Sequence, residues 1–441
     1  MSDRPDPPSL SLFSLCSLVV ANMVGTGVFT SVGFHLVSIR SGFVLLGLWV
    51  LGGLCALCGA LCYAELGTIY LRSGGEYTFL SRIYARPVGF LAGWVSATAG
   101  FAAPVALAAM ALGSYASRME PRIHPGHLAC AVIAATTVLH ILVPRAGLLF
   151  QNGFTVLKVA IILVLIGAGA CCVPAGDTPF LPRAGDLGEV GSAPFAIALV
   201  FVMYAYSGWN ASTYVASETR DPRRDLPRSL VAGTMAVMLL YVGLNWAFLR
   251  STPTAQLAGQ TEVGLIAATH ILGPALGRWM GAGIVLLLVS TISAMIWIGP
   301  RVIQAMGADY PVFGRLGAQS RKGVPAWAML FQSSLSLIFI ATGTYDRVLM
   351  FAQFSMLLCT FLAAAGVVVL RFTQPLQERP YRTWGYPATP VVFCAVTLWM
   401  LIYVMRCRTE ESLMGIATLL AGLLVYRLSR GMDHGVEVQK D

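Results

Sequence analysis

Long apolar runs separated by short polar segments make up almost the whole of the 441-residue chain. About twelve of these runs are long enough to cross a bilayer as a helix, which takes roughly 20 mostly apolar residues. The predicted spans are residues 10–36, 42–66, 87–115, 128–143, 148–172, 193–217, 229–250, 277–304, 325–343, 347–371, 388–405 and 411–428. Charged residues form only 11% of the chain, less than half the roughly 25% of a soluble domain. The pattern therefore predicts an all-α integral membrane protein.

The first span is interrupted near its middle by two glycines around a threonine, in the run Val24-Gly25-Thr26-Gly27-Val28-Phe29. Glycine loses the most backbone entropy in a helix, so this run disfavours a continuous helix. One interpretation is that small residues let two membrane helices pack closely. The other is a broken helix, whose second half would present free backbone amides to an anion such as a carboxylate.

A second interruption favours the broken helix. The run Tyr204-Ala205-Tyr206-Ser207-Gly208-Trp209-Asn210 lies in the middle of the sixth span, and the two interruptions fall in comparable halves of the chain. Paired interruptions at corresponding positions of two halves point to the midplane binding site of a transporter. We therefore expect a substrate site between the first and sixth spans.

The distribution of basic residues predicts the orientation of the chain. If the N-terminus is inside the cell, the inner segments hold 19 of the 29 Lys and Arg residues and the outer segments hold nine. The positive-inside rule then places both terminal tails, residues 1–9 and 429–441, in the cytoplasm. The orientation in the membrane thus accounts for the net charge of +9. We expect the protein to lie in a lipid bilayer and not to bind nucleic acid. The compact loops suit the inner membrane of a bacterium.

No constellation of residues in the sequence predicts an enzyme, a metal site or a cofactor. The cysteines fall almost entirely inside apolar runs, and Cys55-Ala56-Leu57-Cys58 has no second pair or histidine to complete a metal site. We expect buried thiols that pack as small apolar side chains. The histidines are scattered at span ends and in loops, without a nucleophile–base pair.

Lys158 is the one basic residue deep inside a predicted span, in the run from Phe154 to Leu163. An ammonium group well inside a membrane helix is costly and marks function by default. The alternative is that its long stem reaches the membrane surface. However, the residue lies roughly 15 Å along the helix from the cytoplasmic start of its span, too far for that reach. We therefore expect Lys158 to have a functional role.

Two segments between the spans also carry structural expectations. Residues 63–77 combine charged residues with paired glycines, which excludes a lipid-facing helix and leaves an ordinary loop or a re-entrant segment open. Residues 255–272 are expected to hold a short helix over the outer mouth of the protein.

Four motifs resemble the L-type amino acid transporter family, the light-chain-like members of the amino acid–polyamine–organocation superfamily. They are Gly25-Thr-Gly-Val-Phe29, Tyr63-Ala-Glu-Leu-Gly67, Arg72-Ser-Gly-Gly-Glu-Tyr77 and Ala205-Tyr-Ser-Gly-Trp-Asn210, the last followed by Glu218, Asp221, Pro222, Pro227 and Arg228. The resemblance runs over essentially the whole chain. It implies a fold of five plus five helices in inverted repeats, at 10–172 and 193–371, with two further spans at 388–428.

The resemblance also implies roles for individual residues. The amides around Thr26 and Gly27 would bind the substrate carboxylate, and the carbonyls of Tyr204, Ala205 and Ser207 would bind its ammonium group. The implied substrate-binding residues are Val24, Gly25, Thr26, Gly27, Tyr204, Ala205, Ser207, Gly208 and Asn210. The residues expected at the gates are Tyr204, as an aromatic lid, with Trp209, Glu65 and Glu218.

For Lys158 the resemblance implies the place at which sodium-coupled relatives bind a cation. Its expected partners are carbonyls between Ala21 and Val24 and the hydroxyls of Ser290 or Thr291. A fixed positive charge there would remove the need for sodium. A lysine that can release its proton would instead couple transport to protons.

The pocket for the substrate side chain is expected to be free of acidic residues. No Asp or Glu occurs at 88–115, 193–217, 281–306 or 348–370, the stretches expected to line it. The pocket residues expected are Ser207, Gly100, Pro104, Met295 and Trp297. Because an unpaired cationic side chain pays a heavy desolvation cost there, neutral amino acids are the expected substrates.

Together these features predict a sodium-independent exchanger of neutral amino acids. The alternatives are proton-coupled uptake, exchange of a cationic amino acid for its amine and, from another class, a non-transporting amino acid sensor. A sensor would normally need a signalling domain or a long tail, whereas about a dozen residues follow the last span. The segment from Ser117 to Leu128 has no cysteine, so no disulfide-linked heavy chain is expected.

Overall fold

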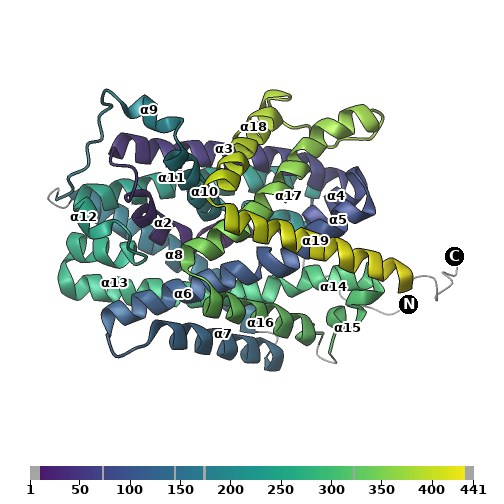
Figure 1. Cartoon of the computed structure of the whole chain (residues 1–441), viewed down its shortest axis with the longest axis horizontal. Coiled ribbons are helices and arrows are strands. Elements are labelled where there is room, and N and C mark those ends of the chain that lie inside the picture. Colours follow the sequence, from purple (N-terminus) through teal and green to yellow (C-terminus); the bar gives the residue numbers. More distant parts are fainter. Residues whose placement is uncertain (1–9, 72–73, 144–145, 172–174, 321–322, 433–441) are drawn as a thin grey trace.

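The computed structural model describes residues 10–71, 74–143, 146–171, 175–320 and 323–432. Most of this part of the chain is helical, and the β-type contact within it is a parallel bridge between Leu10 and Thr219. Figure 1 shows the helices packed side by side, many of them along the long direction of the molecule. The all-helical fold that the hydrophobic pattern predicts is confirmed.

The helices follow one another with mostly short connections. The first part of the chain forms α1 (Leu12–Met23), α2 (Gly27–His35), α3 (Gly42–Ile69), α4 (Glu76–Ile83), α5 (Arg86–Val95), the π-helical turn η1 (Ser96–Gly100), α6 (Ala102–Met119) and α7 (Pro125–Leu142). The middle forms α8 (Ala146–Cys171), α9 (Asp186–Val190), α10 (Ala193–Tyr206), the 3-10 helix η2 (Ala211–Glu218), α11 (Pro222–Ser251), α12 (Thr254–Leu257) and α13 (Val263–Ile298). The last part forms α14 (Pro300–Asp309), η3 (Pro311–Phe313), α15 (Gly314–Gly317), α16 (Ala326–Thr342), α17 (Tyr345–Thr373), α18 (Ala388–Cys407) and α19 (Thr409–Met432).

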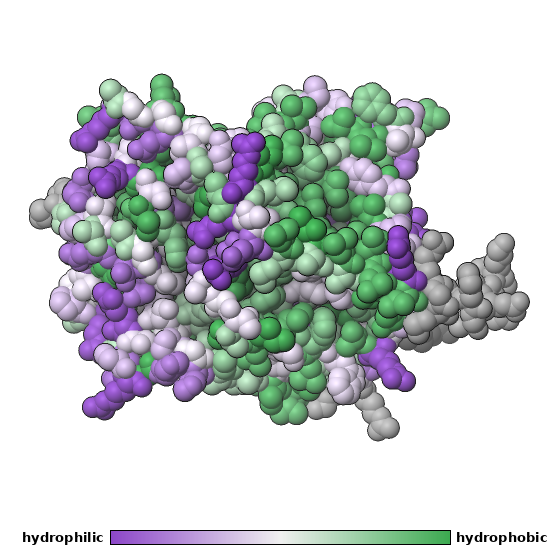
Figure 2. Space-filling model, in the orientation of Figure 1, coloured by the Kyte–Doolittle hydropathy of each residue, from purple (hydrophilic) through white to green (hydrophobic). Residues whose placement is uncertain are grey.

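The lengths and apolar composition of these helices suit a membrane. Within the described residues, eleven helical segments are long and apolar enough to cross one. A shorter apolar helix, α16 with 17 residues, occupies the place of the ninth predicted span. Figure 2 shows apolar side chains over much of the face around α16, α17 and α19, with hydrophilic side chains gathered toward the left end. The chain is therefore an integral membrane protein.

Two groups of helices meet at the centre of the molecule. In the first group α11 packs along α1 and α3, and α10 packs against α2 and α3. In the second group α6 packs against α7, α13 and α16. α17 contacts both groups, through α3 and α6, and also packs on α18 and α19. The first group contains both of the spans that the sequence marks as interrupted.

Several spans are not continuous helices. α1 ends at Met23 before α2 begins at Gly27, and α10 ends at Tyr206 before η2 begins at Ala211. The interruptions predicted in the first and sixth spans are therefore present. In α13, Gly273 has a non-helical backbone with φ +81°, which sets off residues 263–272 as the short helix expected between the seventh and eighth spans.

Residues 63–77, left open above as a loop or a re-entrant segment, are divided between two helices. α3 continues to Ile69, and α4 begins at Glu76 after Gly74 and Gly75, whose φ angles of +130° and +54° favour glycine. Residues 62–68 and 76–80 are buried in the protein. Protein therefore covers these two stretches, as a segment that avoids lipid requires.

Candidate functional site between the two broken helices

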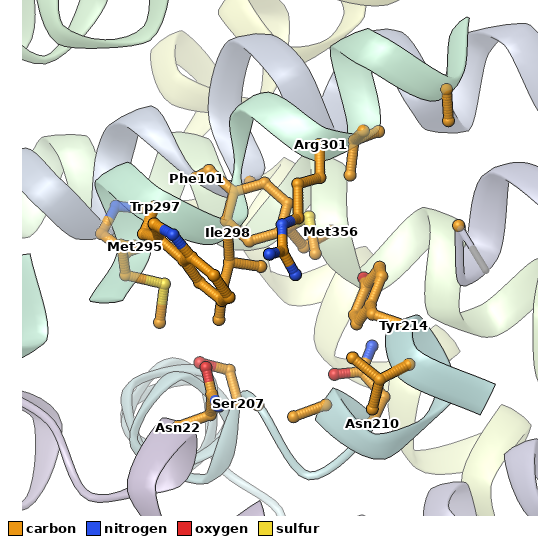
Figure 3. Close-up of a pocket in the computed structure, with 18 of the residues that line it drawn as sticks. Asn22, Phe101, Ser207, Asn210, Tyr214, Met295, Trp297, Ile298, Arg301 and Met356 are labelled. Carbon is orange, nitrogen blue, oxygen red and sulfur yellow. The ribbon is translucent and has the colours of Figure 1, made fainter. Parts of the chain in front are cut away.

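A cavity of about 600 Å³ lies beside the two interruptions. In Figure 3, Asn22 and Ser207 lie on one side of it, and Phe101 and Trp297 lie on the opposite side. The first pair comes from the broken spans, whereas the second pair comes from α13 and the segment between η1 and α6. The cavity therefore separates the two groups of helices.

The cavity extends in one direction from the interruptions. Its wall continues past Glu218 and Arg301 to Ala308 and Gln319, which lie in or next to η2, α14 and α15. Figure 1 shows α14 and α15 at the right-hand end of the molecule, where α19 also ends. We call this end the open end and the opposite one, which holds α12, the closed end.

The first interruption brings the start of α2 against α10. A Cβ atom on Gly27 would lie 2.5 Å from the Cα atom of Ala205, so only glycine fits this crossing. The first amides of a helix have no intrahelical acceptor. The Thr26 hydroxyl, at the N-cap, pairs with the Tyr204 hydroxyl at 3.0 Å instead of capping α2. The Thr26 side chain therefore does not cap the start of α2, and anion binding by its first amides stays a prediction.

The second interruption lies next to the first and is more open. Gly208 has φ +96°, and a Cβ atom there would lie 2.9 Å from the Asn22 carbonyl oxygen. Ser207 lies at the cavity and is exposed. The Ser207 amide donates to the Tyr204 carbonyl at 3.0 Å, so one of the carbonyls expected to bind an ammonium group already accepts a bond. A carbonyl oxygen can accept a second hydrogen bond.

Tyr241 of α11 joins the two interruptions. Its buried hydroxyl lies 2.6 Å from the Met23 carbonyl oxygen and 3.2 Å from the Ala205 carbonyl oxygen. These carbonyls stand at the broken ends of α1 and α10, where helical partners are missing. Tyr241 carries no functional signal in the sequence, because a tyrosine among apolar residues of a span looks like ordinary packing.

Lys158 of α8 is buried behind the first interruption. Its ammonium group donates to the Ala21 carbonyl at 3.2 Å and to the Thr291 hydroxyl at 3.1 Å. Ser290, the other hydroxyl considered, is buried next to Thr291 in the chain. The structure thus brings Lys158 to two partners expected from the sequence, between α1 and α13. Its role in coupling stays a prediction.

Glu76, at the start of α4, is a buried carboxylate that the sequence analysis did not single out. Its Oε1 atom accepts bonds from Tyr63 at 3.0 Å and from Asn210 at 2.7 Å. Its Oε2 atom accepts from Tyr214 at 2.6 Å. Glu76 therefore fixes the second interruption and the start of η2 from behind. A carboxylate directly after two glycines at the start of a helix was the signal available in the sequence.

The side of the interruptions away from the cavity's exit is sealed. Thr30 of α2 pairs with Tyr345 of α17 through their hydroxyls at 3.0 Å. Phe34 stacks on both Phe201 and Tyr345, with ring centroids 5.1 and 5.6 Å apart. These contacts join α2, α10 and α17 toward the closed end.

The residues expected at the gates lie in different surroundings. Trp209 is buried against Tyr63, with ring centroids 4.7 Å apart, and its other side reaches the cavity. Glu218 lines the cavity on its way to the open end. Glu65, in contrast, is fully buried away from that wall and bonds to Arg371 at 2.9 Å.

The expected site residues therefore divide into two sets. The cavity wall includes Tyr204, Ser207, Gly208, Trp209, Asn210, Glu218, Gly100, Pro104, Met295 and Trp297. In the part of the chain that the structure describes, Val24, Gly25, Thr26, Gly27 and Ala205 lie behind this wall. Tyr204, which is in the wall and bonds to Thr26, links the two sets.

Arg301 is a further cavity residue that the sequence analysis missed. Its guanidinium group lies over the Trp297 ring, 3.6 Å from the centroid, and points into the cavity in Figure 3. Arg301 and Glu218 are the two residues with a fixed charge in the described wall. Arg301 lies in the first turn of α14, at the end of an otherwise apolar run, where an arginine is more often a topology signal.

A membrane-spanning helical bundle in which two interrupted helices meet beside a central cavity defines a transporter of the discontinuous-helix class. The chain belongs to the amino acid permease family, whose model matches residues 10–424.

Individual relatives agree with this assignment. The chain is 28% identical over 433 residues to the b(0,+)-type amino acid transporter 1 of Homo sapiens, covering 95% of this chain and 87% of that protein. It is 27% identical over 424 residues to the serine/threonine exchanger SteT of Bacillus subtilis (strain 168), covering 94% and 95%. It is 25% identical over 441 residues to the large neutral amino acids transporter small subunit 2 of Mus musculus, covering 96% and 81%.

Proposed function

We propose that the protein is a sodium-independent exchanger of neutral L-amino acids that works by alternating access. The observation that carries this proposal is the place of Lys158, whose ammonium group bonds to the Ala21 carbonyl and the Thr291 hydroxyl. Carbonyl and hydroxyl oxygens are also the ligands of a hard cation such as sodium. A lysine held there supplies the positive charge permanently, so the first span keeps its shape without a bound ion.

The substrate is proposed to bind at the two interruptions. Its carboxylate would meet the free amides at the start of α2, and its ammonium group would meet the carbonyls of Tyr204 and Ser207. In the present conformation the Tyr204 hydroxyl bonds to Thr26 and covers the start of α2. Binding would therefore require Tyr204 to move, which fits the role of an aromatic lid.

The charges of the cavity support a neutral substrate. Arg301 and Glu218 give the described wall one charge of each sign, and the carboxylate of Glu76 already accepts three hydrogen bonds from Tyr63, Asn210 and Tyr214. The wall opposite Ser207 is formed by apolar and aromatic side chains such as Met295 and Phe101. A neutral side chain can enter this region without a large desolvation cost.

The conformation corresponds to one of the two states that alternating access requires. The cavity reaches the open end, whereas the contacts of Thr30 and Phe34 with α17 close the other end. The excess of basic residues in the segments at the open end supports a cytoplasmic location for it. We further propose that residues 10–172 and 193–371 are the two inverted repeats, that both tails are cytoplasmic, that the membrane is a bacterial inner membrane, and that no heavy chain is needed.

The test is uptake of a labelled neutral amino acid into proteoliposomes, with and without internal unlabelled amino acid. We expect uptake to require internal substrate and to be unchanged when choline replaces external sodium. Uptake into empty vesicles driven by a proton gradient would favour proton coupling instead. Binding without transport under every gradient would favour the sensor. In a competition panel, arginine or lysine outcompeting alanine, serine and leucine would overturn the neutral-substrate proposal.

A further inference from the structure

The segment between α17 and α18 presents large apolar side chains to the outside of the protein. Leu376 and Trp384 are 98% and 79% exposed, and Phe372, in the last turn of α17, is 79% exposed. Leu376 and Trp384 lie outside the two spans that the segment joins, which end at Thr373 and begin at Ala388. Lipid tails around the spans therefore do not account for their exposure. We call residues 372–387 the apolar connection.

The apolar connection is held firmly to the body of the protein. The Thr383 amide donates to Glu65 at 2.6 Å, and Arg371 and Arg379 lie 2.9 and 3.4 Å from the same carboxylate. Arg371 also lies over the Tyr386 ring, 4.4 Å from its centroid. Because a fully buried carboxylate anchors it, the connection is fixed to the body of the protein and its exposed side chains keep a defined position.

The charge of this surface is positive. Glu378 pairs with Arg223 of α11 at 3.4 Å, and Arg382 is exposed. Arg371 and Arg379 pair with the buried Glu65 and Arg223 pairs with Glu378, so the exposed Arg382 carries the surplus charge at the surface of the connection. The surplus positive charge lies next to the exposed apolar side chains.

A second connection, at the closed end, also exposes large apolar side chains, but it has no surplus of basic residues beside them. Residues 175–192 expose Leu181 and Leu187 by 79% and 88%. That segment carries three acidic residues, one of which is Asp177, against one arginine. The Thr254 amide donates to Asp177 at 2.8 Å, which lowers the pKa of that carboxyl and keeps it charged. The two apolar surfaces thus have opposite charge.

We infer that the apolar connection is a docking surface for anionic lipid in the membrane leaflet at the open end. Phe372, Leu376 and Trp384 would enter the boundary between headgroups and acyl chains, where tryptophan is favoured. Arg382 would lie at the level of the lipid phosphates, which attract basic residues next to a span. Through Glu65, a leaflet bound here is connected to the end of α3, which packs against α10 of the interrupted sixth span and against α11, the neighbour of α1.

The test is quenching of tryptophan fluorescence in nanodiscs of phosphatidylcholine, with and without phosphatidylglycerol, whose acyl chains are brominated. The difference between the wild type and Trp384→Phe isolates the emission of Trp384. We expect this emission to be blue-shifted, quenched by the brominated chains, and quenched more strongly when phosphatidylglycerol is present. Arg382→Gln should remove the effect of phosphatidylglycerol and leave the quenching in phosphatidylcholine. Trp399→Phe, in the middle of α18, is the control and should report quenching that does not depend on headgroup charge.

Two other outcomes would overturn the inference. Emission of Trp384 that is red-shifted and accessible to iodide in both lipids would place the connection in water. Equal quenching with and without phosphatidylglycerol would mean that the surface binds neutral lipid and that its charge is irrelevant. Both substituted side chains are exposed, so a monodisperse elution profile is expected for each variant and separates these outcomes from misfolding.

Discussion

Both interruptions break a membrane-spanning helix, but their backbones and surroundings differ. In the first, three residues separate α1 from α2, and Gly27 is pressed against Ala205. In the second, four residues separate α10 from a 3-10 helix, and Ser207 is exposed at the cavity. The first is buried except for the half-buried Gly25 and is supported by Lys158, whereas the second has one free face at Ser207; Tyr241 bonds to both. The comparison indicates that the first interruption is a fixed support and the second an adaptable surface.

The largest effect is expected where the two interruptions touch. Gly27→Ala places a Cβ atom 2.5 Å from the Ala205 backbone, which overpacks the crossing and costs about 1–3 kcal/mol or more. We expect exchange in proteoliposomes to fall by at least roughly tenfold. Gly25→Ala is the matched control, because its Cβ would make an ordinary contact of 3.6 Å with Thr291. Equal activity of the two variants would contradict the idea of a fixed crossing.

Removing the charge behind the first interruption should have the next largest effect. Lys158→Met loses two hydrogen bonds from a charged donor, but it also removes the cost of burying the ammonium group, which offsets part of that loss. We expect exchange to fall roughly tenfold or more, equally in sodium and in choline. Thr291→Val keeps the charge and removes one acceptor, so its loss should be smaller. Full activity of Lys158→Met would show that the first interruption needs no such support.

The second interruption should tolerate a substitution better than the first. Gly208→Ala introduces a side chain at φ +96°, a strain of about 1–2 kcal/mol, and also brings its Cβ atom to 2.9 Å from the Asn22 carbonyl, a closer contact than the Gly25 control makes but a longer one than at Gly27. We expect the apparent affinity for substrate to weaken roughly fivefold to thirtyfold while exchange at saturation persists. Gly185→Ala is the control, because Gly185 has φ +106° in open space far from the site. Loss of the maximal rate in Gly208→Ala would mean that this interruption is also a rigid support.

The smallest effect is expected for the bridge between the two interruptions. Tyr241→Phe keeps the ring, which packs on Trp49 and Tyr206, and removes only the hydroxyl. Losing a hydrogen bond of this kind costs about 1 kcal/mol, or roughly fivefold in exchange rate. A double variant with Gly208→Ala measures whether the bridge couples the two interruptions. Strictly additive losses would show that it does not.

The sequence predicted the spans, both interruptions and the burial of Lys158, because each leaves a local signal in hydropathy or in glycine content. It did not predict Glu76, since its burial results from contacts with Tyr63 and Tyr214 that no local pattern records. It also did not predict that Glu65, expected at a gate, anchors the connection between α17 and α18. The direction in which the cavity opens is a property of one conformational state, and a sequence encodes both states at once.

The bridge between Leu10 and Thr219 gives the two interrupted spans a second junction. The Leu10 amide donates to the Glu218 carbonyl at 2.9 Å, and the Arg220 amide donates to the Leu10 carbonyl at 3.2 Å. Two helices that are joined at one point can rotate about it, whereas helices that are joined at two points are restrained to move together. We therefore expect the first and sixth spans to move together, and a fluorescent label near Leu10 to report the movement of Glu218 at the mouth of the cavity.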